Sequence, residues 1–467
     1  MSESFKADIA VMPAPALQLF SQCALFESAC KIVQGLNDAG FITYFAGGSV
    51  RDVLLGRNCK DIDIATSATP DEVQKVFPRV TDIQGKSFGV VRVIENEYMF
   101  EVATFRTDGA YLDGRRPERV TFATPGEDAF RRDFTINGLF FDPLSNQVID
   151  FVKGRDDLSA GIVRAIGNPQ KRFKEDRLRL FRAIRFSSEF GFNIEQKTWE
   201  ALCDMSEATL KPNHAALAPE RVRDELIKTF TGSGPVQALD QLDESGLLKL
   251  WLPEVAELKG VEQPPQFHPE GDVFVHTRLM LELMNETPGL NVVFGVLFHD
   301  IGKPPTKKID QTGRIRFNEH EIVGARMTEE LMKRLRFSND QIKAVCALVA
   351  GHMKFKDAPK MRLSTLKRFL AQPYFEDELE LHRIDCLGSH ADLGIYDFIK
   401  EKRNDFIHEE VVPPPLVTGK ELIKLGMHSG PAMGKILRQL QDEQLEGLFK
   451  NKDDALVRAK ELIQNIS

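Results

Sequence analysis

Residues 46–66 read AGGSVRDVLLGRNCKDIDIAT, and this stretch decides the fold of the N-terminal part of the chain. The preceding run FITYF is aromatic and β-branched, which predicts a strand. Gly47 and Gly48 then let a backbone come close to phosphate groups, and a short helix is expected over 50–55. Asp61 and Asp63 are separated by one residue in an alternating segment, so both carboxylates point to one face of a strand. We therefore predict an α/β unit in which a phosphate-binding turn lies beside two acids.

Two carboxylates on one face of a strand repel each other unless a cation lies between them. Hard oxygen ligands that leave room for substrate phosphates suit Mg²⁺, so Asp61 and Asp63 are predicted to be catalytic residues and metal ligands. The simplest chemistry for these parts is nucleotidyl transfer from a nucleoside triphosphate. The alternative, which a lone acid pair would favour, is a glycine turn followed by a solvated acidic hairpin. The glycine pair, Arg51 and the strand context argue against that alternative.

The composition narrows the class of protein. The chain has 467 residues, and its 61 Lys+Arg against 69 Asp+Glu give a net charge of −8. This balance excludes a globally basic nucleic-acid binder, so any RNA contact has to come from local basic patches. The six cysteines include no CxxC pair, no apolar run reaches the length of a membrane span, and the N-terminus lacks a signal pattern. These features predict a reduced, cytoplasmic protein that does not enter a membrane.

The histidines are confined to the second half of the chain. All ten lie at or beyond position 214. The N-terminal half therefore lacks an imidazole base, and metal ions and carboxylates remain as its means of catalysis. Glu101, in the strand-like segment FEVATF, is a candidate third catalytic carboxylate near the metals. The alternative for Glu101 is an ordinary exposed strand glutamate.

Arginines gather in two further segments. RRDFTIN, at 131–137, contains Arg132, whose planar fork suits phosphate oxygens, and Asp133, which can orient a guanidinium or cap the following turn. In EDRLRLFRAIR an acid and three arginines recur every three residues along one face of an expected helix. They are Asp176, Arg179, Arg182 and Arg185. The acid and the first arginine offer an acceptor and a donor to a base edge, and the alternative is a solvated face of i,i+3 salt bridges.

Taken in order and at these intervals, GGSVRDVLLG, DIDIAT, RRDFTING and EDRLRLFRAIRF resemble class II tRNA nucleotidyltransferases and bacterial poly(A) polymerases. The resemblance covers roughly residues 25–230. It implies a polymerase-β-like head in which Asp61 and Asp63 hold two metals. It also implies that Asp176 and Arg179 read the Watson–Crick edge of the incoming base. Further nucleotide contacts are implied for Gly48, Arg51, Arg132, Arg182 and Arg185.

One segment of the head resembles a loop that separates members of this family. TFRTDGAYLDGRRPERV, at 104–120, is similar to the flexible loop of enzymes that add the final A. The resemblance therefore implies addition of CCA to the 3′ end of tRNA from CTP and ATP, with Mg²⁺ as cofactor. Poly(A) polymerase or A-only addition is the nearest alternative, because the shared motifs do not separate these activities.

A different set of ligands lies in the second half of the chain. His276, the dipeptide His299–Asp300 and Asp385 follow the order H…HD…D, and the dipeptide comes directly after the apolar run VVFGVLF. Neutral imidazole with carboxylate suits Mn²⁺, Fe, Ni²⁺ or Zn²⁺, and open coordination positions suit phosphoester hydrolysis. The spacing resembles the HD phosphohydrolase superfamily, in which His320 and His352 would extend the site to two metals. Because some HD domains keep the fold without activity, the resemblance implies metal binding more directly than hydrolysis.

Breaks in composition divide the chain into four predicted domains. Pro- and Gly-rich stretches such as GVEQPPQFHPEGD and VVPPPL separate the helical blocks. The prediction is an α/β head at 1–154, an all-α neck at 155–250, an HD domain at 251–395 and a helical tail at 396–467. An HD metallophosphohydrolase with a nucleotide- or RNA-binding head is the alternative of another class. A non-catalytic RNA-binding scaffold conflicts with the intact acid pair, and the oligomeric state is left open.

Overall fold

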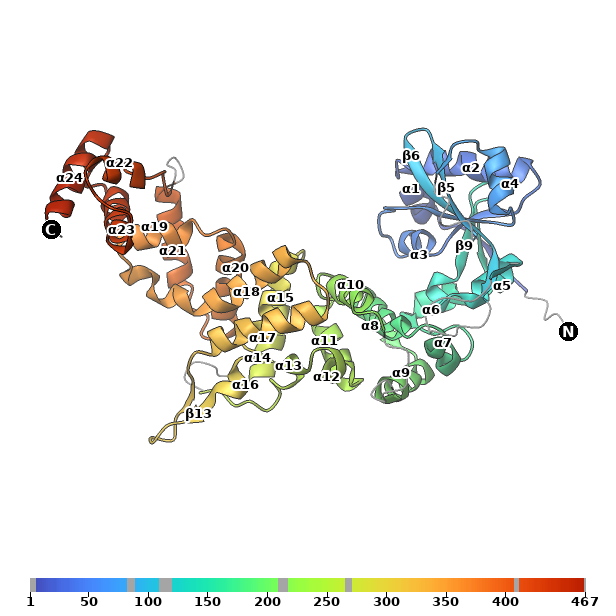
Figure 1. Cartoon of the computed structure of the whole chain (residues 1–467). Coiled ribbons are helices and arrows are strands. Elements are labelled where there is room, and N and C mark those ends of the chain that lie inside the picture. Colours follow the sequence, from blue (N-terminus) through green and yellow to red (C-terminus); the bar gives the residue numbers. More distant parts are fainter. Residues whose placement is uncertain are drawn as a thin grey trace. The chain divides into compact units, whose positions relative to one another are not determined.

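The computed structural model describes residues 6–81, 89–108, 120–208, 217–264, 271–406 and 411–465. The chain divides into two compact units, Met1–Trp251 and Leu252–Ser467 (Figure 1). The four predicted domain boundaries are finer than this division and stay predictions. Most of the predicted loop at 104–120 lies outside the described residues. Among the described helices, none combines the length and apolar character that a bilayer crossing requires.

The first unit begins with a mixed sheet of eight strands in the order β1-β10-β9-β2-β3-β6-β5-β4. Neighbouring strands are antiparallel except for β3 and β6, which run parallel. The strands are β1 Asp8–Val11, β2 Thr43–Ala46, β3 Asp63–Thr66, β4 Val80–Thr81, β5 Val90–Glu95, β6 Tyr98–Thr104, β9 Leu139–Asp142 and β10 Gln147–Asp150. A separate hairpin pairs β7 Arg106–Asp108 with β8 Val120–Phe122.

Aromatic side chains fix both faces of this sheet. On one face Phe20 lies 5.7 Å from Phe45 and 5.2 Å from Phe141, measured between ring centroids. On the other face Phe140 packs edge-on against Phe105 at 5.8 Å. Because successive strand residues alternate between faces, this packing sets the register of β2 and β9. The helices of the head are α1 Ala14–Ser21, α2 Phe26–Asp38, α3 Gly48–Leu54, α4 Pro70–Val76, α5 Pro125–Arg131 and α6 Gly154–Ala160, with the 3-10 turn η2 Thr135–Asn137.

The elements predicted for the head are present, with shifted ends. The short helix begins at Gly48 rather than at 50. Strand β3 begins at Asp63, so Asp61 lies just before the strand and not within it. The alternation nevertheless holds, because Asp61 and Asp63 are exposed while Ile62 is buried. Thr69 caps the start of α4, because its side chain accepts a hydrogen bond from the backbone N–H of Glu72.

The neck is helical, as predicted, apart from one pair of two-residue strands. Its helices are α7 Pro169–Glu175, α8 Leu178–Phe190, α9 Gln196–Ala208, α10 Pro219–Phe230, α11 Pro235–Glu244 and α12 Leu247–Trp251, and the strands are β11 Ile162–Val163 and β12 Asn193–Ile194. The expected arginine helix corresponds to α8. Asp176 precedes that helix in an extended conformation that ends α7, so the prediction that it shares the helical face is wrong.

The second unit is built from helices and one hairpin. Its elements are α13 Pro253–Ala256, α14 Val273–Glu282, α15 Leu290–Phe298, α16 Lys303–Thr306, β13 Lys307–Ile309, β14 Ile315–Phe317, α17 His320–Arg334, α18 Asn339–Gly351, η3 His352–Lys360, α19 Leu363–Leu370, α20 Phe375–Gly388, α21 Gly394–Asp405, α22 Gly419–Lys424, α23 Pro431–Leu445 and α24 Lys452–Gln464. The apolar helix α15 is buried among α14, α18 and α20. A separate apolar cluster holds α22, α23 and α24 together.

Candidate active site

The acid pair lies where β2 ends and β3 begins, beside the glycine turn. Asp63 pairs with Ala46, the last residue of β2, and Gly47 follows directly. Gly47 has φ 71°, and a Cβ on it would lie 2.9 Å from Nη1 of Arg132. Glycine is therefore required there both by the backbone conformation and by the approach of a guanidinium. The turn brings a cationic group to the same edge of the sheet as the carboxylate of Asp63.

The electrostatics of Asp63 indicate a place for a cation. Partial burial raises the pKa of Asp63 to about 6, and the charges of Asp61 and Glu101 add to the rise, while Arg132 opposes it. Glu101 lies next to Asp63 because β6 runs parallel to β3 with Val102 opposite Ile64. Three carboxylates in one place destabilise one another unless a cation neutralises them. The residues present therefore fit a divalent metal with oxygen ligands.

The third carboxylate is held differently from the acid pair. Glu101 is exposed, and its Oε1 lies 3.1 Å from Nη2 of Arg92 on the neighbouring strand β5. Its position suits both alternatives raised by the sequence, a ligand near the metals and an exposed strand glutamate. The catalytic role of Glu101 stays a prediction.

A cavity of about 490 Å³ opens beside Asp63. All the residues predicted to contact nucleotide line it, namely Gly47, Gly48, Arg51, Arg132, Asp176, Arg179, Arg182 and Arg185. The same cavity is lined by side chains that were not predicted to contact nucleotide, which are Arg131, Asp133, Asn137 and Phe186. The sequence segments 46–63, 131–137 and 176–186 thus converge on one cavity with a strongly cationic lining.

Buried hydrogen-bond acceptors hold the arginines of the head. Arg51 is 7% exposed and donates to Oδ1 of Asn137 at 2.5 Å and of Asp52 at 2.8 Å. Arg132 donates to Oδ2 of Asp128 at 3.0 Å and to the backbone oxygen of Asn137 at 3.2 Å. Burial alone would raise the pKa of Asp128, but Arg132 and Arg131 outweigh it and lower that pKa. Asp128 therefore stays ionised and keeps both guanidinium groups at the cavity.

The arginines of α8 are anchored across the fold. Arg182 donates from Nε to Oδ2 of Asp133 at 2.7 Å. Burial would raise the pKa of Asp133, but Arg182 and Asn137 hold it well below its usual range. Arg185 donates to Oε2 of Glu225 on α10 at 2.7 Å. Since these partners are distant in sequence and partly buried, the alternative of a solvated i,i+3 salt-bridge face does not describe α8.

The two residues predicted to read the base have protein partners. Asp176 accepts from Nη2 of Arg221 at 2.9 Å, and Arg179 donates to Oε2 of Glu175 at 2.8 Å. Arg179 is 7% exposed, so it lies at the bottom of the cavity rather than on a solvated face. Of the anchoring acids, Asp133 carried a sequence signal, because it stands inside RRDFTIN. Glu225 carried none, since its partner comes from another helix. Asp128 was missed although it lies three and four residues before Arg131 and Arg132, a helical spacing that could have indicated these ion pairs.

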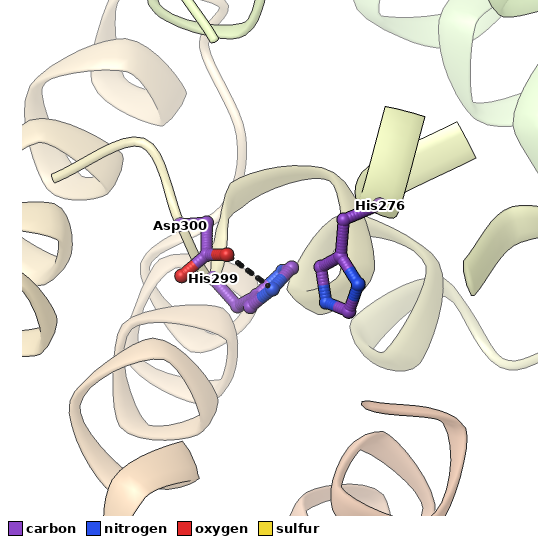
Figure 2. A group of neighbouring side chains, drawn as sticks. All are labelled: His276, His299 and Asp300. Atoms are coloured by element: carbon purple, nitrogen blue, oxygen red, sulfur yellow. Dashed lines mark ion pairs between the residues drawn. The ribbon is translucent and has the colours of Figure 1, made fainter. Parts of the chain in front are cut away.

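The second unit brings the predicted metal ligands together. His276 comes from α14, His299 and Asp300 follow α15, and Asp385 comes from α20. Nε2 of His276 lies 3.1 Å from Oδ1 of Asp385, and Nε2 of His299 lies 3.0 Å from Oδ2 of Asp300. Figure 2 shows His276, His299 and Asp300 turned toward one another. His320 and His352 lie close to the other side of Asp300, so this carboxylate belongs to two possible metal-binding groups.

The protonation of the histidines indicates that these nitrogens face a cation. Nδ1 of His320 and of His352 each donate to a backbone carbonyl, at 2.8 and 2.7 Å. Burial lowers the pKa of both rings, that of His352 to about 3, so both are neutral and carry their proton on Nδ1. Their two Nε2 atoms are nevertheless 3.1 Å apart. Two lone pairs that face each other repel, and a metal ion between them and Asp300 removes that repulsion.

The same arrangement recurs at His299. Its Nδ1 donates to the backbone oxygen of Val296 at 2.9 Å, which leaves a lone pair on Nε2. That Nε2 has no hydrogen-bond partner among the residues that the structure describes. Burial would raise the pKa of Asp300, but His299, Lys303 and His320 hold it well below its usual range. A buried carboxylate with imidazole nitrogens on both sides fits a transition metal better than Mg²⁺.

The cavity above these ligands is cationic. It measures about 540 Å³ and is lined by His299, Asp300, His320, His352 and Asp385, together with Lys303, Arg314 and Lys356. Lys303 is buried and its Nζ lies 2.6 Å from Oδ2 of Asp300. A metal cluster with several cations at its rim suits an anionic substrate such as a phosphoester.

We expect metal binding at the head to depend on pH. A metal ion competes with the proton on Asp63, so Mn²⁺ affinity should be full at pH 7.5 and fall about tenfold per unit below pH 6. Electron paramagnetic resonance of free Mn²⁺ measures this in a His299→Ala, Asp300→Ala background, which removes the other site. Asp61→Asn should move the transition to lower pH, because one carboxylate charge is lost. A transition that does not move would contradict the coupling of Asp61 with Asp63.

We expect Gly302→Ala to disrupt the histidine cluster. A Cβ on Gly302 would lie 2.1 Å from the backbone oxygen of His320, so α16 and α17 would have to separate. The variant should lose about 1–3 kcal/mol of stability and bind Ni²⁺ at least tenfold more weakly. Thermal denaturation and calorimetric titration measure both. Gly289→Ala is the matched control, because nothing lies within 4 Å of its added Cβ. Unchanged Ni²⁺ binding in Gly302→Ala would contradict the placement of His320 at the metal.

Known families match successive parts of the chain. The model described as "Poly A polymerase head domain" matches residues 43–164, which contain the acid pair and the RRDFTIN segment. The model described as "Probable RNA and SrmB- binding site of polymerase A" matches residues 191–259. The model described as "HD domain" matches residues 273–392, which contain the predicted metal ligands of the second unit. The order of these matches agrees with the resemblance found in the sequence.

Solved structures and curated relatives extend the likeness to nearly the whole chain. The Bacillus stearothermophilus CCA-adding enzyme in complex with CTP is 25% identical with a TM-score of 0.71, and the match covers 95% of this chain and 100% of that one. The Thermotoga maritima CCA-adding enzyme complexed with tRNA, at 18% identity and a TM-score of 0.60, shares the fold over 98% of this chain and 99% of that one. The CCA-adding enzyme of Ligilactobacillus salivarius (strain UCC118) is 31% identical over 94% of this chain and 97% of its own. The CCA-adding enzyme of Lactobacillus helveticus (strain DPC 4571) is 32% identical over 92% of this chain and 96% of its own length, and the chain therefore belongs to the CCA-adding enzyme family, a family of nucleotidyltransferases.

Proposed function

We propose that the head adds CCA to the 3′ end of tRNA, with CTP and ATP as substrates and pyrophosphate as the released product. The observation that carries this proposal is the single cavity in which the carboxylate of Asp63 meets the arginines of α3, α5 and α8. A carboxylate pair that holds metal beside a cationic pocket is what transfer of a nucleotide from a triphosphate requires. Membership of the CCA-adding enzyme family supports the choice of tRNA, CTP and ATP.

The proposed metal is Mg²⁺, held by Asp61 and Asp63, with Glu101 as a third carboxylate. Such ions would lower the pKa of the tRNA 3′-hydroxyl and stabilise the pyrophosphate leaving group. The protein supplies the remaining charge, because Arg51 and Arg132 lie at the glycine turn where backbone and guanidinium groups reach phosphate oxygens. The raised pKa of Asp63 supports a cation at this place.

We propose that Asp176 and Arg179 select the base in place of a template strand. Asp176 offers two acceptor oxygens and Arg179 offers donors, which together match the edge of a cytosine or an adenine. Each side chain already holds a protein partner, Arg221 for Asp176 and Glu175 for Arg179. Base binding therefore exchanges one set of hydrogen bonds for another, and the net gain is smaller than the gross strength of the new bonds. Such exchange suits a pocket that has to accept two bases in turn.

Poly(A) or A-only addition is the competing activity of the same site. Both activities use the acid pair, the glycine turn and the arginines in the same way. The two activities differ in the nucleotides that they incorporate and in the length of the product. The acid pair is the same in both and does not distinguish them.

We propose that the HD domain is a second, metal-dependent site that hydrolyses phosphoesters. The observation that supports it is the pair of unprotonated Nε2 atoms of His320 and His352 beside Asp300, which belong with a metal ion. His276, His299 and Asp385 would complete a site for two ions of Ni²⁺, Mn²⁺, Fe or Zn²⁺. A cytoplasmic location is proposed as well, supported by six free cysteines.

The proposal for the head predicts a product of fixed length. Given a tRNA that lacks CCA, the protein with Mg²⁺ should add two C residues from CTP alone and should add C, C and A when ATP is also present. The product is read on a sequencing gel. Long A tails would instead identify a poly(A) polymerase, and acceptance of only tRNA that already ends in CC would identify A-only addition. Absence of any incorporation would overturn the proposal.

If the two proposed sites act independently, substitutions in one site should abolish its activity and leave the activity of the other site unchanged. Asp61→Ala and Asp63→Ala should reduce nucleotide incorporation by about a thousandfold or more and leave hydrolysis of p-nitrophenyl phosphate with Ni²⁺ unchanged. His299→Ala and Asp300→Ala should have the opposite effect, because they remove ligands of the other cluster. Glu97→Ala, which removes an exposed acid in the β5–β6 turn, is the control for loss of charge. Incorporation that survives Asp61→Ala would place the catalytic acids elsewhere.

A further inference from the structure

One aromatic ring in the nucleotide cavity is surrounded by three guanidinium groups. Phe186 of α8 is 3% exposed and also lines the cavity. Its ring centroid lies 4.1 Å from Cζ of Arg185, 5.0 Å from that of Arg51 and 5.1 Å from that of Arg182. Arg51 belongs to α3 in the head, whereas Arg182 and Arg185 belong to α8 in the neck. One side chain therefore touches cations that come from separate parts of the unit.

Such a cluster of like charges has to be stabilised without neutralising it. Every arginine that is fully paired with a carboxylate loses part of its attraction for a nucleotide phosphate. The face of an aromatic ring attracts a guanidinium group through its quadrupole, and it takes up none of the N–H donors. Phe186 therefore holds three guanidinium groups in place and leaves their remaining donors for a ligand. Carboxylates hold part of each guanidinium group. Asp133 accepts from Nε and Nη2 of Arg182. Arg185 donates from Nε to Glu225 and from Nη1 to Glu189.

A second ring extends the same contact toward the catalytic acids. Phe190 stacks on Phe186 with centroids 5.9 Å apart and planes 6° apart. Its centroid lies 4.8 Å from Cζ of Arg51 and 4.5 Å from that of Arg57. Arg57 also donates to the backbone oxygen of Glu189 at 2.8 Å, and it stands in the segment between α3 and Asp61. The end of α8 thus holds both the helix of the glycine turn and the segment that leads to the acid pair.

We propose that Phe186 and Phe190 are positioning residues that couple the head to the arginine row of α8, and that Phe186 sets the affinity for the triphosphate shared by both nucleotides. This inference rests on the proposed function of the head. The arginines around Phe186 are placed for phosphates, whereas Asp176 and Arg179 are placed for the base. Loss of the ring should therefore weaken the binding of CTP and of ATP to the same extent and leave the choice between the two nucleotides unchanged.

The test compares two substitutions of Phe186 with a matched control on the same helix. Phe186→Leu should raise the KM for CTP and for ATP about fivefold each, with the preference at each addition step unchanged. Phe186→Tyr retains the aromatic face, so its KM for both nucleotides should stay near the wild-type value. Phe181→Leu is the control, because Phe181 is buried on α8 but packs against Trp251 at 5.9 Å instead of an arginine. Thermal denaturation reports whether Phe186→Leu and Phe181→Leu lose similar stability.

The outcomes separate the inference from the proposed function. Equal KM values for Phe186→Leu and the wild type would overturn the inference, and so would an equal rise in Phe181→Leu, which would indicate a merely structural effect. A rise confined to one nucleotide would place Phe186 in base selection and would also overturn it. Calorimetric Kd values for CTP and ATP are measured on the same variants without tRNA. If the wild type binds nucleotide but adds none to tRNA, the proposed function fails, while the Kd values still decide the role of Phe186.

Discussion

Repulsion between like charges is the constraint on which the head depends. Asp61, Asp63 and Glu101 crowd one edge of the sheet, and burial together with that crowding raises the pKa of Asp63 to about 6. Arginines of three helices line the same cavity as Asp63. Neither group is stable alone, and each attracts what the other lacks. A metal–triphosphate complex carries both signs of charge, so it satisfies the acids with its cation and the arginines with its phosphates.

Each group of charges is held in place by its own contacts within the fold. The pairing of Ala46 with Asp63 fixes the acids at the end of two strands, and buried aromatic contacts between β2 and β9 prevent a shift of register. The arginines are held by hydrogen bonds to Asp128, Asp133 and Glu225. These acids are buried, so the arginines cannot swing across the cavity to Asp63 without leaving an uncompensated carboxylate behind. Direct salt bridges between these arginines and the acid pair are therefore disfavoured. Such salt bridges would block the site.

The sequence predicted the parts of the site that are local. The glycine turn, the acid pair, RRDFTIN and the arginine row are short patterns with their own geometry, and all of them line or border one cavity. What the sequence could not predict depends on contacts between distant segments. Glu225 of α10 accepts a hydrogen bond from Arg185, and the guanidinium group of Arg51 of α3 lies against the ring of Phe186. Neither contact can be predicted from the residue spacing within one helix. The place of Asp176 was also misjudged, because the break between α7 and α8 depends on its extended backbone and not on a proline or glycine signal.

Both units bring groups of like charge or facing lone pairs together, but the two sites consist of different kinds of side chain. In the head, the proposed ligands are carboxylates exposed to the cavity, and hard oxygen ligands of this kind would suit an ion that arrives and leaves with the triphosphate. In the HD domain, buried imidazoles of His299, His320 and His352 each donate Nδ1–H to a backbone carbonyl, which orients their lone pairs before any metal binds. Preorientation of this kind lowers the cost of binding and favours a resident ion. The difference follows from the distribution of histidine along the chain, since the head contains none and has only oxygen ligands to offer a cation.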